Sequence, residues 1–448
     1  MHRRSFVTGL AALGAQVVLR PYSVRAAQQP DIALRIAPVS LDIGNGRSVK
    51  TIGFNGSAPG PLIRLHEGQA VSADIVNETG ERQLVHWHGL HIPSDVDGSV
   101  EEGTPLIEPH REAHYEFTAT PAGFRWYHGH ISAGRDFGKG LYSGQFGLIY
   151  IEPRDNPGAF DQEIFLALRA WEPYFTAGDT AAEVAYNSYT VNGKSLGAGE
   201  PLRVREGERI LFHLINASAT DTQRLALPGH RIHVIALDGN PVAAPADVDY
   251  VDIAPAERVD AVVEMRQPGV WILGSTDSQV RKKGLGIVVE YAGQAGAARW
   301  VDPASDAPWD YTRFGCQTAN AGPVPDETIP LMFKSKFGGH NWPDSWTING
   351  QSYPKSDSPV LVQGRRYRLV LDNQSGDPHP VHLHRHTFEL TRVNGVPTSG
   401  VRKDTVVVSP HRQVEVDFVA DNPGPTLLHC HQQLHMDYGF MMLFRYAT

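Results

Sequence analysis

The chain has 448 residues, of which 41% are hydrophobic and 20% charged, a composition typical of a globular protein with two or three domains. That composition excludes collagen-like and disordered chains. The formal net charge is -9, and an acidic surface argues against nucleic acid as a partner.

The first 26 residues predict an export signal. Arg3 and Arg4 stand just before Ser5 and Phe6, and a modest apolar stretch follows, as in a twin-arginine signal peptide. Cleavage after Ala26 would make the formal net charge -13 and would place the protein in the periplasm or outside the cell. The alternative is that these residues form a basic N-terminal helix that is not cleaved off. No later run approaches the ~20 apolar residues of a membrane span.

Three segments repeat one pattern, in which an Asn-Gly turn and a proline precede two alternating strands that are separated by a glycine and closed by an asparagine. The glycine and the closing asparagine are nine positions apart in every copy: Gly68 to Asn77, Gly207 to Asn216 and Gly364 to Asn373. Repetition at some 140 to 160 residues is too long for a solenoid repeat and predicts three homologous domains.

Strand periodicity dominates each copy. Runs such as "ILFHLIN" and "YRLVLDN" alternate or are β-branched, and turn residues punctuate them. Helical amphipathicity is scarce, so the predicted fold class is all-β, with each domain a Greek-key β-sandwich or barrel. After the predicted signal peptide, residues 1–26, linker-like stretches indicate domains over 27–155, 156–300 and 320–448.

Four pairs of histidines have the form His-X-His. Residues i and i+2 of a strand face the same side, so each pair aims two imidazoles at one point. A single pair is readily a coincidence, but two pairs in the first domain and two in the last predict a shared metal site where these domains meet. The pairs are His86 and His88, His128 and His130, His382 and His384, and His429 and His431.

Cys430 lies between His429 and His431, so strand alternation turns its side chain to the opposite face from theirs. Two imidazoles and one thiolate in a trigonal array make a blue-copper electron-transfer site, and His379 and His435 are the natural companions of Cys430. The alternative is a disulfide with Cys316, the other cysteine of the chain. We favour the metal site because Cys430 has potential ligands on both sides and Cys316 has none.

The motifs "HWHG", "WYHGH", "HPVHLHRHTF" and "HCHQQLHMDYGFMM" occur in the order of the four copper-binding motifs of multicopper oxidases. Over essentially the whole mature chain, the sequence resembles a three-domain, laccase-like member of that family. The resemblance implies three cupredoxin-like domains and four copper ions. It implies type 1 copper bound by Cys430, His379 and His435. It also implies type 2 copper bound by His86 and His382, and a type 3 pair bound by His88, His128, His130, His384, His429 and His431.

The mechanism that the resemblance implies is four one-electron oxidations of a reductant at the type 1 copper. Electrons would pass through Cys430 to the trinuclear cluster, where dioxygen is reduced to water. Asp97 matches an acidic residue that the family places beside the cluster, so it is a candidate for proton delivery. The alternative for Asp97 is an ordinary turn residue before Gly98.

Two positions depart from the pattern of many bacterial relatives. Met436 stands where they have a glutamate, and Asp437 would point away from the site on an extended strand. Phe440 occupies the axial position of the type 1 copper and cannot coordinate it, which should raise the reduction potential. Core packing is the favoured role of Met441 and Met442, although a shift in register by one residue would offer a sulfur ligand.

The expected partners are a small aromatic reductant, a phenol or an aromatic amine, and dioxygen. Cuprous ion, manganous ion and bilirubin-like tetrapyrroles remain alternatives, but the chain has only six methionines and no methionine-rich insert for a cuprous site. A non-enzymatic exported relative is a further alternative, and the complete ligand set argues against it. A copper nitrite reductase would lack the four His-X-His pairs.

Overall fold

The repeated glycines each form a turn between two strands. In this computed structural model, which describes residues 29–153, 160–176, 182–303, 308–316 and 323–447, Gly68, Gly207 and Gly364 have φ of 83°, 85° and 83°. This left-handed conformation suits glycine. Each backbone N–H donates to a carbonyl at the end of a neighbouring segment of the same domain.

The repeated asparagines end the second strand of each unit and are fully buried. The side-chain amide of Asn77 donates to the carbonyls of Glu81 and Ile107, and Asn216 and Asn373 make equivalent bonds. In each domain this buried amide therefore ties the loop after the strand to a second loop. In the third domain the tied loop leads directly to His379.

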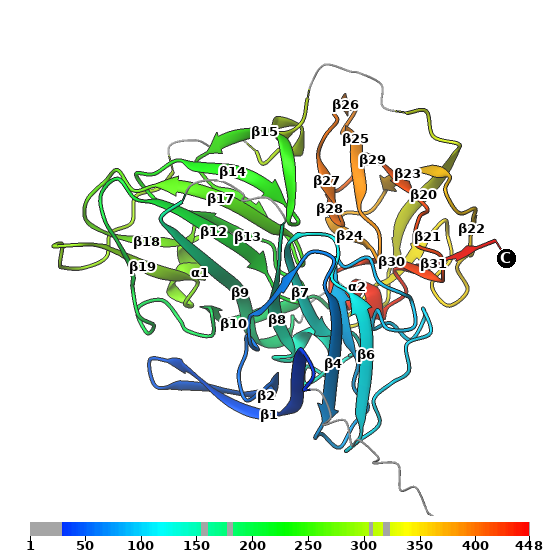
Figure 1. Cartoon of the computed structure of the whole chain (residues 1–448), viewed down its shortest axis with the longest axis horizontal. Coiled ribbons are helices and arrows are strands. Elements are labelled where there is room, and N and C mark those ends of the chain that lie inside the picture. The colour runs from blue at the N-terminus through cyan, green and yellow to red at the C-terminus, as the bar shows by residue number, and fades with distance from the viewer. Residues whose placement is uncertain (1–28, 154–159, 177–181, 304–307, 317–322, 448) are drawn as a thin grey trace, which may run out of the picture.

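The first domain packs two four-stranded sheets around a common apolar core (Figure 1). One sheet has the order β2-β1-β4-β6: β1 Ile32–Gly44, β2 Arg47–Phe54, β4 Ala70–Asn77 and β6 Glu112–Thr118. The other has the order β3-β8-β7-β5: β3 Ile63–His66, β5 Val85–His88, β7 Gly123–Gly129 and β8 Phe146–Glu152. A short 3-10 helix, η1, spans Gly140–Tyr142.

The second domain has a six-stranded and a five-stranded sheet. The first has the order β10-β9-β12-β17-β14-β15: β9 Gln162–Phe175, β10 Val184–Val191, β12 Arg209–Asn216, β14 Ile232–Leu237, β15 Asn240–Val248 and β17 Arg258–Glu264. The second has the order β11-β19-β18-β13-β16: β11 Leu202–Val204, β13 Gln223–Ala226, β16 Val251–Ile253, β18 Val270–Ser275 and β19 Gly286–Tyr291. Helix α1 spans Ser278–Lys282.

The third domain follows a connection that contains the 3-10 helix η2, Tyr311–Phe314. One sheet contains β20 Glu327–Lys336, β21 Ser345–Ile348, β23 Arg366–Asn373, β25 Phe388–Val393, β26 Val396–Pro397, β27 Arg402–Lys403 and β29 Gln413–Val419. The other has the order β22-β31-β30-β24-β28: β22 Val360–Leu361, β24 His379–Leu383, β28 Thr405–Val408, β30 Thr426–Cys430 and β31 Met441–Tyr446. Helix α2 spans Gln433–Asp437.

The predicted all-β fold class is confirmed by these six sheets. The predicted signal peptide, the boundary at residues 155 and 156 and the start of the third domain at 320 lie outside the described residues, and the boundaries stay predictions. No helix in the described part of the chain is long and apolar enough to cross a membrane.

The strands that carry the His-X-His pairs are buried on both faces. In β4 and β23 buried and more exposed residues alternate, whereas every residue of β5, β24 and β30 is buried. A strand buried on both faces has a second layer against its outer side. Here that layer is the other domain: Figure 1 shows β7 of the first domain beside β24, β30 and α2 of the third, at the centre of the molecule.

His213 in β12 joins two carboxylates within the buried face of the second domain. Its Nδ1 lies 2.8 Å from Asp260 Oδ1 and its Nε2 lies 3.2 Å from Glu163 Oε1. Burial disfavours the imidazolium, but Asp260 and Glu163 outweigh burial and raise the pKa of His213 to about 9. His213 is therefore protonated in the folded protein at neutral pH.

We expect the copper-free protein to become less stable at alkaline pH, because His213 then loses its proton and its two contacts with carboxylates weaken. The folded-state pKa exceeds the unfolded value of ~6.5, so the stabilisation is fully present below pH ~6.5 and is lost as the pH rises through 9. The shift corresponds to about 3 kcal/mol in the free energy of unfolding. Denaturant unfolding at several pH values should show this loss in the wild-type protein and not in His213→Gln. Equal slopes in both would contradict the assignment.

Candidate metal centres

Three side chains of the third domain converge on one point. His379 Nδ1 lies 3.1 Å from His435 Nδ1, and Cys430 Sγ lies 3.7 Å and 3.4 Å from these two nitrogens. His379 begins β24, Cys430 ends β30, and His435 lies in α2, so two strands and a short helix bring the donor atoms together. All three residues are buried.

The neighbouring residues and the burial of the trio keep its two imidazoles in the neutral form that binds metals. Ser375 Oγ lies 2.8 Å from His379 Nε2 and can accept a hydrogen bond from it, which leaves the lone pair of Nδ1 free for a metal. Burial lowers the pKa of His379 to about 3 and that of His435 well below its usual value, so both imidazoles are neutral. Burial also raises the pKa of the Cys430 thiol, and a bound cation would counteract this effect.

Aromatic rings cover the trio. The Phe440 ring lies 4.7 Å from the His379 ring, and the Trp346 ring lies 4.0 Å from the His435 ring. Phe440 is fully buried and offers no donor atom. Met442 packs in the large core, and Met441 packs with Met436 in a separate apolar cluster. These contacts agree with the core-packing role expected for both methionines.

The four His-X-His pairs form a single buried cluster between the first and third domains. Their rings interleave across the interface: His86 stacks on His384 at 4.0 Å, and His88 stacks on His382 at 3.7 Å. The cluster consists of His86, His88, His128, His130, His382, His384, His429 and His431. Cys430 joins the two centres, because its neighbours on both sides belong to this cluster while its own sulfur belongs to the trio.

Most of these imidazoles present a nitrogen that has no hydrogen-bond partner among the described residues. These buried atoms are Nε2 of His86, His128, His130 and His382, Nδ1 of His88, and both ring nitrogens of His431. Burial, with the neighbouring imidazoles, lowers the pKa of most members well below the usual range and that of His429 to about 4. Unpartnered, buried imidazole nitrogens are costly unless they bind metal ions, so the cluster fits a multinuclear metal site.

The second nitrogen of several imidazoles is fixed by an oxygen of the protein. His86 Nδ1 lies 2.8 Å from the Asp97 carbonyl oxygen, and His384 Nδ1 lies 2.8 Å from Asp97 Oδ2. His88 Nε2 lies 3.0 Å from Asp404 Oδ1, and His382 Nδ1 lies 2.8 Å from the Asp404 carbonyl oxygen. These bonds select the tautomer in which the remaining nitrogen faces the cluster.

A second carboxylate accompanies Asp97 at the edge of the cluster. Glu102 is buried, accepts a hydrogen bond from the Leu427 amide at 2.6 Å, and places Oε2 3.6 Å from His384 Nδ1. Burial and then the Asp97 charge raise the pKa of Glu102 well above its usual value. Burial alone would raise the pKa of Asp97, but His86 and His384 hold it well below its usual value.

Family models described as multicopper oxidase match residues 36–156, 170–289 and 327–448. The chain belongs to the multicopper oxidase family. It is therefore a copper-dependent oxidoreductase. The trio offers two imidazoles and a thiolate and the cluster offers imidazoles, which are ligands that copper accepts.

The relatives of this multicopper oxidase include bacterial and fungal enzymes. Multicopper oxidase MmcO of Mycobacterium tuberculosis is 30% identical over 95% of this chain and 88% of its own length. Laccase-2 of Fomitopsis schrenkii is 27% identical over 89% of this chain and 86% of its own length. A crystal structure of a multi-copper oxidase from Pseudomonas thermotolerans matches 93% of this chain and 98% of its own, with a TM-score of 0.72 and 26% identity. The predicted resemblance to a three-domain, laccase-like member is confirmed.

One local prediction for this multicopper oxidase is wrong. Residues 433–437 form α2 rather than an extended strand, so Asp437 does not turn away as alternation would require. Its Oδ2 accepts hydrogen bonds from the amides of Ala133 and Gly134, at 3.1 Å and 2.8 Å. Asp437 therefore ties the third domain to the loop that follows His130.

The alternative pairing of the two cysteines is also settled by the geometry. Cys316 is exposed, Cys430 is buried, and neither is in a disulfide. Gly98 has a left-handed φ of 95°, as in a turn, and the Asp97 side chain contacts two histidines of the cluster, while the role of Asp97 in proton delivery stays a prediction.

Sequence reasoning missed four residues near the two centres of this multicopper oxidase. No motif with an assigned role contains any of the four, which are Glu102, Trp346, Ser375 and Asp404. Only Ser375 had a local signal, because its hydroxyl group stands four positions before His379 in the sequence. The others reach the site from distant segments, so spacing along the chain could not reveal them.

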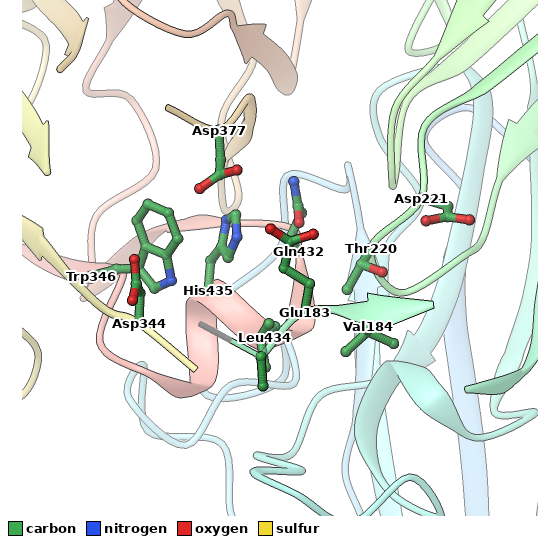
Figure 2. A pocket seen from close by; sticks show the side chains of 11 residues that line it. Glu183, Val184, Thr220, Asp221, Asp344, Trp346, Asp377, Gln432, Leu434 and His435 are labelled. Carbon is green, nitrogen blue, oxygen red and sulfur yellow. The ribbon is translucent and has the colours of Figure 1, made fainter. Parts of the chain in front are cut away.

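Two cavities reach the centres. One of about 160 Å³ lies beside His435 and Trp346, and its wall carries four carboxylates: Glu183, Asp221, Asp344 and Asp377 (Figure 2). Its lining contains no lysine or arginine. The other, of about 550 Å³, reaches His130 and is lined in part by Met436 and Met441.

Proposed function

We propose that this enzyme is a laccase-like oxidase. It would couple four one-electron oxidations of phenols or aromatic amines to the four-electron reduction of dioxygen to water. The observation that supports this most strongly is the position of Cys430, which shares one trio with His379 and His435 while both of its chain neighbours belong to the eight-histidine cluster. The thiolate thus offers a short covalent route between the two centres.

Each ligand set has a proposed copper. Cys430, His379 and His435 would hold type 1 copper, and His86 and His382 would hold type 2 copper. The type 3 pair would be held by His88, His128, His130, His384, His429 and His431. Copper, with four ions per chain, would supply the one-electron redox steps and the binding of dioxygen.

Side chains and cavities of the protein would provide for substrate contact, proton delivery and the entry of dioxygen. His435 lies in the wall of the cavity that contains the four carboxylates, so its imidazole can meet a reductant there. Asp97 would deliver protons, with Glu102 beside it as a second carboxyl group. The cavity at His130 offers an entrance for dioxygen.

Copper content, spectra and oxygen uptake together test the proposal. The fully loaded protein should bind four coppers per chain, show an intense blue absorption band and a type 2 spin-resonance signal, and consume oxygen with a phenol. Fewer than four coppers or no blue band would overturn the copper assignment. Oxygen uptake with Cu(I) but not with any phenol or aromatic amine would overturn the laccase assignment alone.

A second candidate, an oxidase of metal cations, is favoured by the charge of the cavity. Asp344 and Asp377 belong to the third domain, and Glu183 and Asp221 belong to the second, so the wall beside His435 is acidic on both sides. Burial, together with the charges of Glu183 and Asp344, raises the pKa of Asp377. A cation, whether a metal ion or a protonated aromatic amine, would therefore be attracted to this cavity.

We expect the double variant Glu183→Gln, Asp344→Asn to lose kcat/KM for a cationic aromatic amine and to keep it for an uncharged phenol. A contact between opposite unit charges in water is worth ~1 kcal/mol, so each carboxylate should contribute about fivefold. The loss should shrink at high ionic strength. Glu327→Gln, an exposed position in β20, is the control. An equal loss for both substrates would contradict the electrostatic explanation.

Phe440→Met should lower the reduction potential of the type 1 copper. A thioether in place of the phenyl ring would donate to Cu(II) and stabilise it relative to Cu(I). A fall of ~59 mV corresponds to a tenfold change in the one-electron equilibrium. Redox titration of the blue band measures the shift, and Met442→Leu, in the core, serves as the control. An unchanged potential in Phe440→Met would show that residue 440 is not axial to the copper.

We also propose export by the twin-arginine pathway, on the basis of Arg3 and Arg4. Replacing both arginines by lysine should retain the full-length chain inside the cell. Unchanged export of the variant would refute the assignment.

A further inference from the structure

The second domain supplies no histidine to the cluster, yet its side chains reach the residues that orient it. Where the three domains meet, three cationic and three acidic side chains are almost completely buried. They come from the first domain (Arg125), the second (Asp238, Glu257 and Arg258) and the third (Lys403 and Asp404). Buried charges of this kind are costly unless each is paired, and every one of these has an opposite charge within 4 Å.

Asp404 is the member that touches the cluster. Its Oδ1 fixes His88 Nε2 of the first domain, and its backbone carbonyl fixes His382 Nδ1 of the third, at 3.0 Å and 2.8 Å. The opposite nitrogens of these two rings, His88 Nδ1 and His382 Nε2, are the unpartnered ones. One aspartate therefore sets the orientation of two stacked imidazoles from different domains.

Asp404 is held in turn by the second domain. Arg258 donates from both terminal nitrogens to the two carboxylate oxygens of Asp404, at 2.7 Å and 2.5 Å. Asp238 Oδ2 accepts hydrogen bonds from the backbone amides of Asp404 and Thr405, at 3.2 Å and 3.1 Å. Side chain and backbone of Asp404 are thus both anchored, and a bidentate guanidinium fixes the plane of the carboxylate.

Gly89, which follows His88, leaves room for this contact. It has a left-handed φ of 82°, and a Cβ atom there would lie 2.7 Å from Asp404 Oδ2 and 2.9 Å from a terminal nitrogen of Arg258. The turn after the first His-X-His pair is therefore shaped around the pair formed by Arg258 and Asp404.

We propose that Arg258 and Asp238 are positioning residues of the eight-histidine cluster, acting through Asp404 on His88 and His382. The inference rests on the proposed function, since it concerns the residues that orient the type 2 and type 3 ligands. The second domain thereby completes a metal site to which it contributes no ligand.

The test compares Arg258→Lys and Asp238→Asn with Arg169→Lys. Lysine cannot form the bidentate contact, and asparagine at 238 keeps an acceptor while losing the charge. Arg169 is a matched control because it is equally buried and also joins the second domain to the first, donating to the Ser143 carbonyl at 2.6 Å, without contacting any histidine of the cluster. Thermal unfolding of the copper-free proteins records any general loss of stability.

We expect Arg258→Lys and Asp238→Asn to change the hyperfine splitting of the type 2 spin-resonance signal and to lose type 2 copper to a chelator about 10- to 100-fold faster than wild type. The blue band of the Cys430 site should be unchanged. Arg169→Lys should keep the wild-type signal and rate even where it unfolds at a lower temperature.

Wild-type splitting and copper loss in Arg258→Lys and Asp238→Asn would overturn the inference, as would equally fast loss in Arg169→Lys. If Arg258→Lys does not fold, Asp238→Asn alone decides between these outcomes. Failure of the copper assignment is distinguishable, because the fully loaded wild-type protein would then show no type 2 signal. Failure of the laccase assignment alone would leave this comparison of variants unchanged.

Discussion

A Cys430→Ser variant is expected to lose the blue absorption band and to oxidise substrate at least on the order of 10³-fold more slowly, because in the proposed mechanism the thiolate would take part in every turnover. The serine hydroxyl is a hard, neutral ligand that neither gives the charge-transfer band nor provides the route from the trio to His429 and His431. The eight histidines are untouched, so type 2 and type 3 copper should remain. Absorption, copper content and oxygen uptake report these three outcomes separately.

Cys316→Ser is the matched control, since Cys316 is exposed and in no disulfide. It should keep the blue band and full activity. Oxygen uptake at the wild-type rate in Cys430→Ser would show that electrons reach the cluster by another route.

Asp97→Asn is expected to slow the reduction of dioxygen by ~10²-fold or more, the scale of a lost general acid. The asparagine cannot deliver a proton, and it weakens the charged contact with His384 and His86. The type 1 copper would be reduced at the Cys430 trio, which Asp97 does not belong to, so the rate of its reduction should be unaffected. Anaerobic stopped-flow bleaching of the blue band should therefore match wild type, while steady-state oxygen uptake falls.

Asp95→Asn controls for the loss of one negative charge in the same loop, because Asp95 is exposed. Its oxygen uptake should equal that of wild type. If Asp97→Asn also turned over at the wild-type rate, Asp97 would have no part in proton delivery.

The cluster could be predicted because strand geometry is local. Alternation alone placed both members of each His-X-His pair on one face, and it placed Cys430 opposite His429 and His431. The structure brings those residues together as this periodicity requires. The repeated glycine and asparagine were equally informative about the fold. In every domain the glycine forms a left-handed turn, and the buried asparagine amide ties two loops together.

The prediction failed where the geometry depends on distant segments. The turn of helix at residues 433–437 is too short to show a helical period, so Asp437 was placed on a strand. The acidic wall of the cavity at His435 combines Glu183 and Asp221 with Asp344 and Asp377, which belong to another domain. Nothing in the spacing of these four residues relates them to one another.

The eight-histidine cluster also closes a very long loop of chain. His384 and Asp97, which meet inside it, are 287 positions apart, and the whole second domain lies between them. The ligands therefore become neighbours only after both ends of the protein have folded and docked, so metal binding is a late event in assembly. Once bound, the ions stabilise only the docked state. Bound ions would act as a removable cross-link between the first and last domains, one that a chelator would open and that would hold the two parts together after a cut in the second domain.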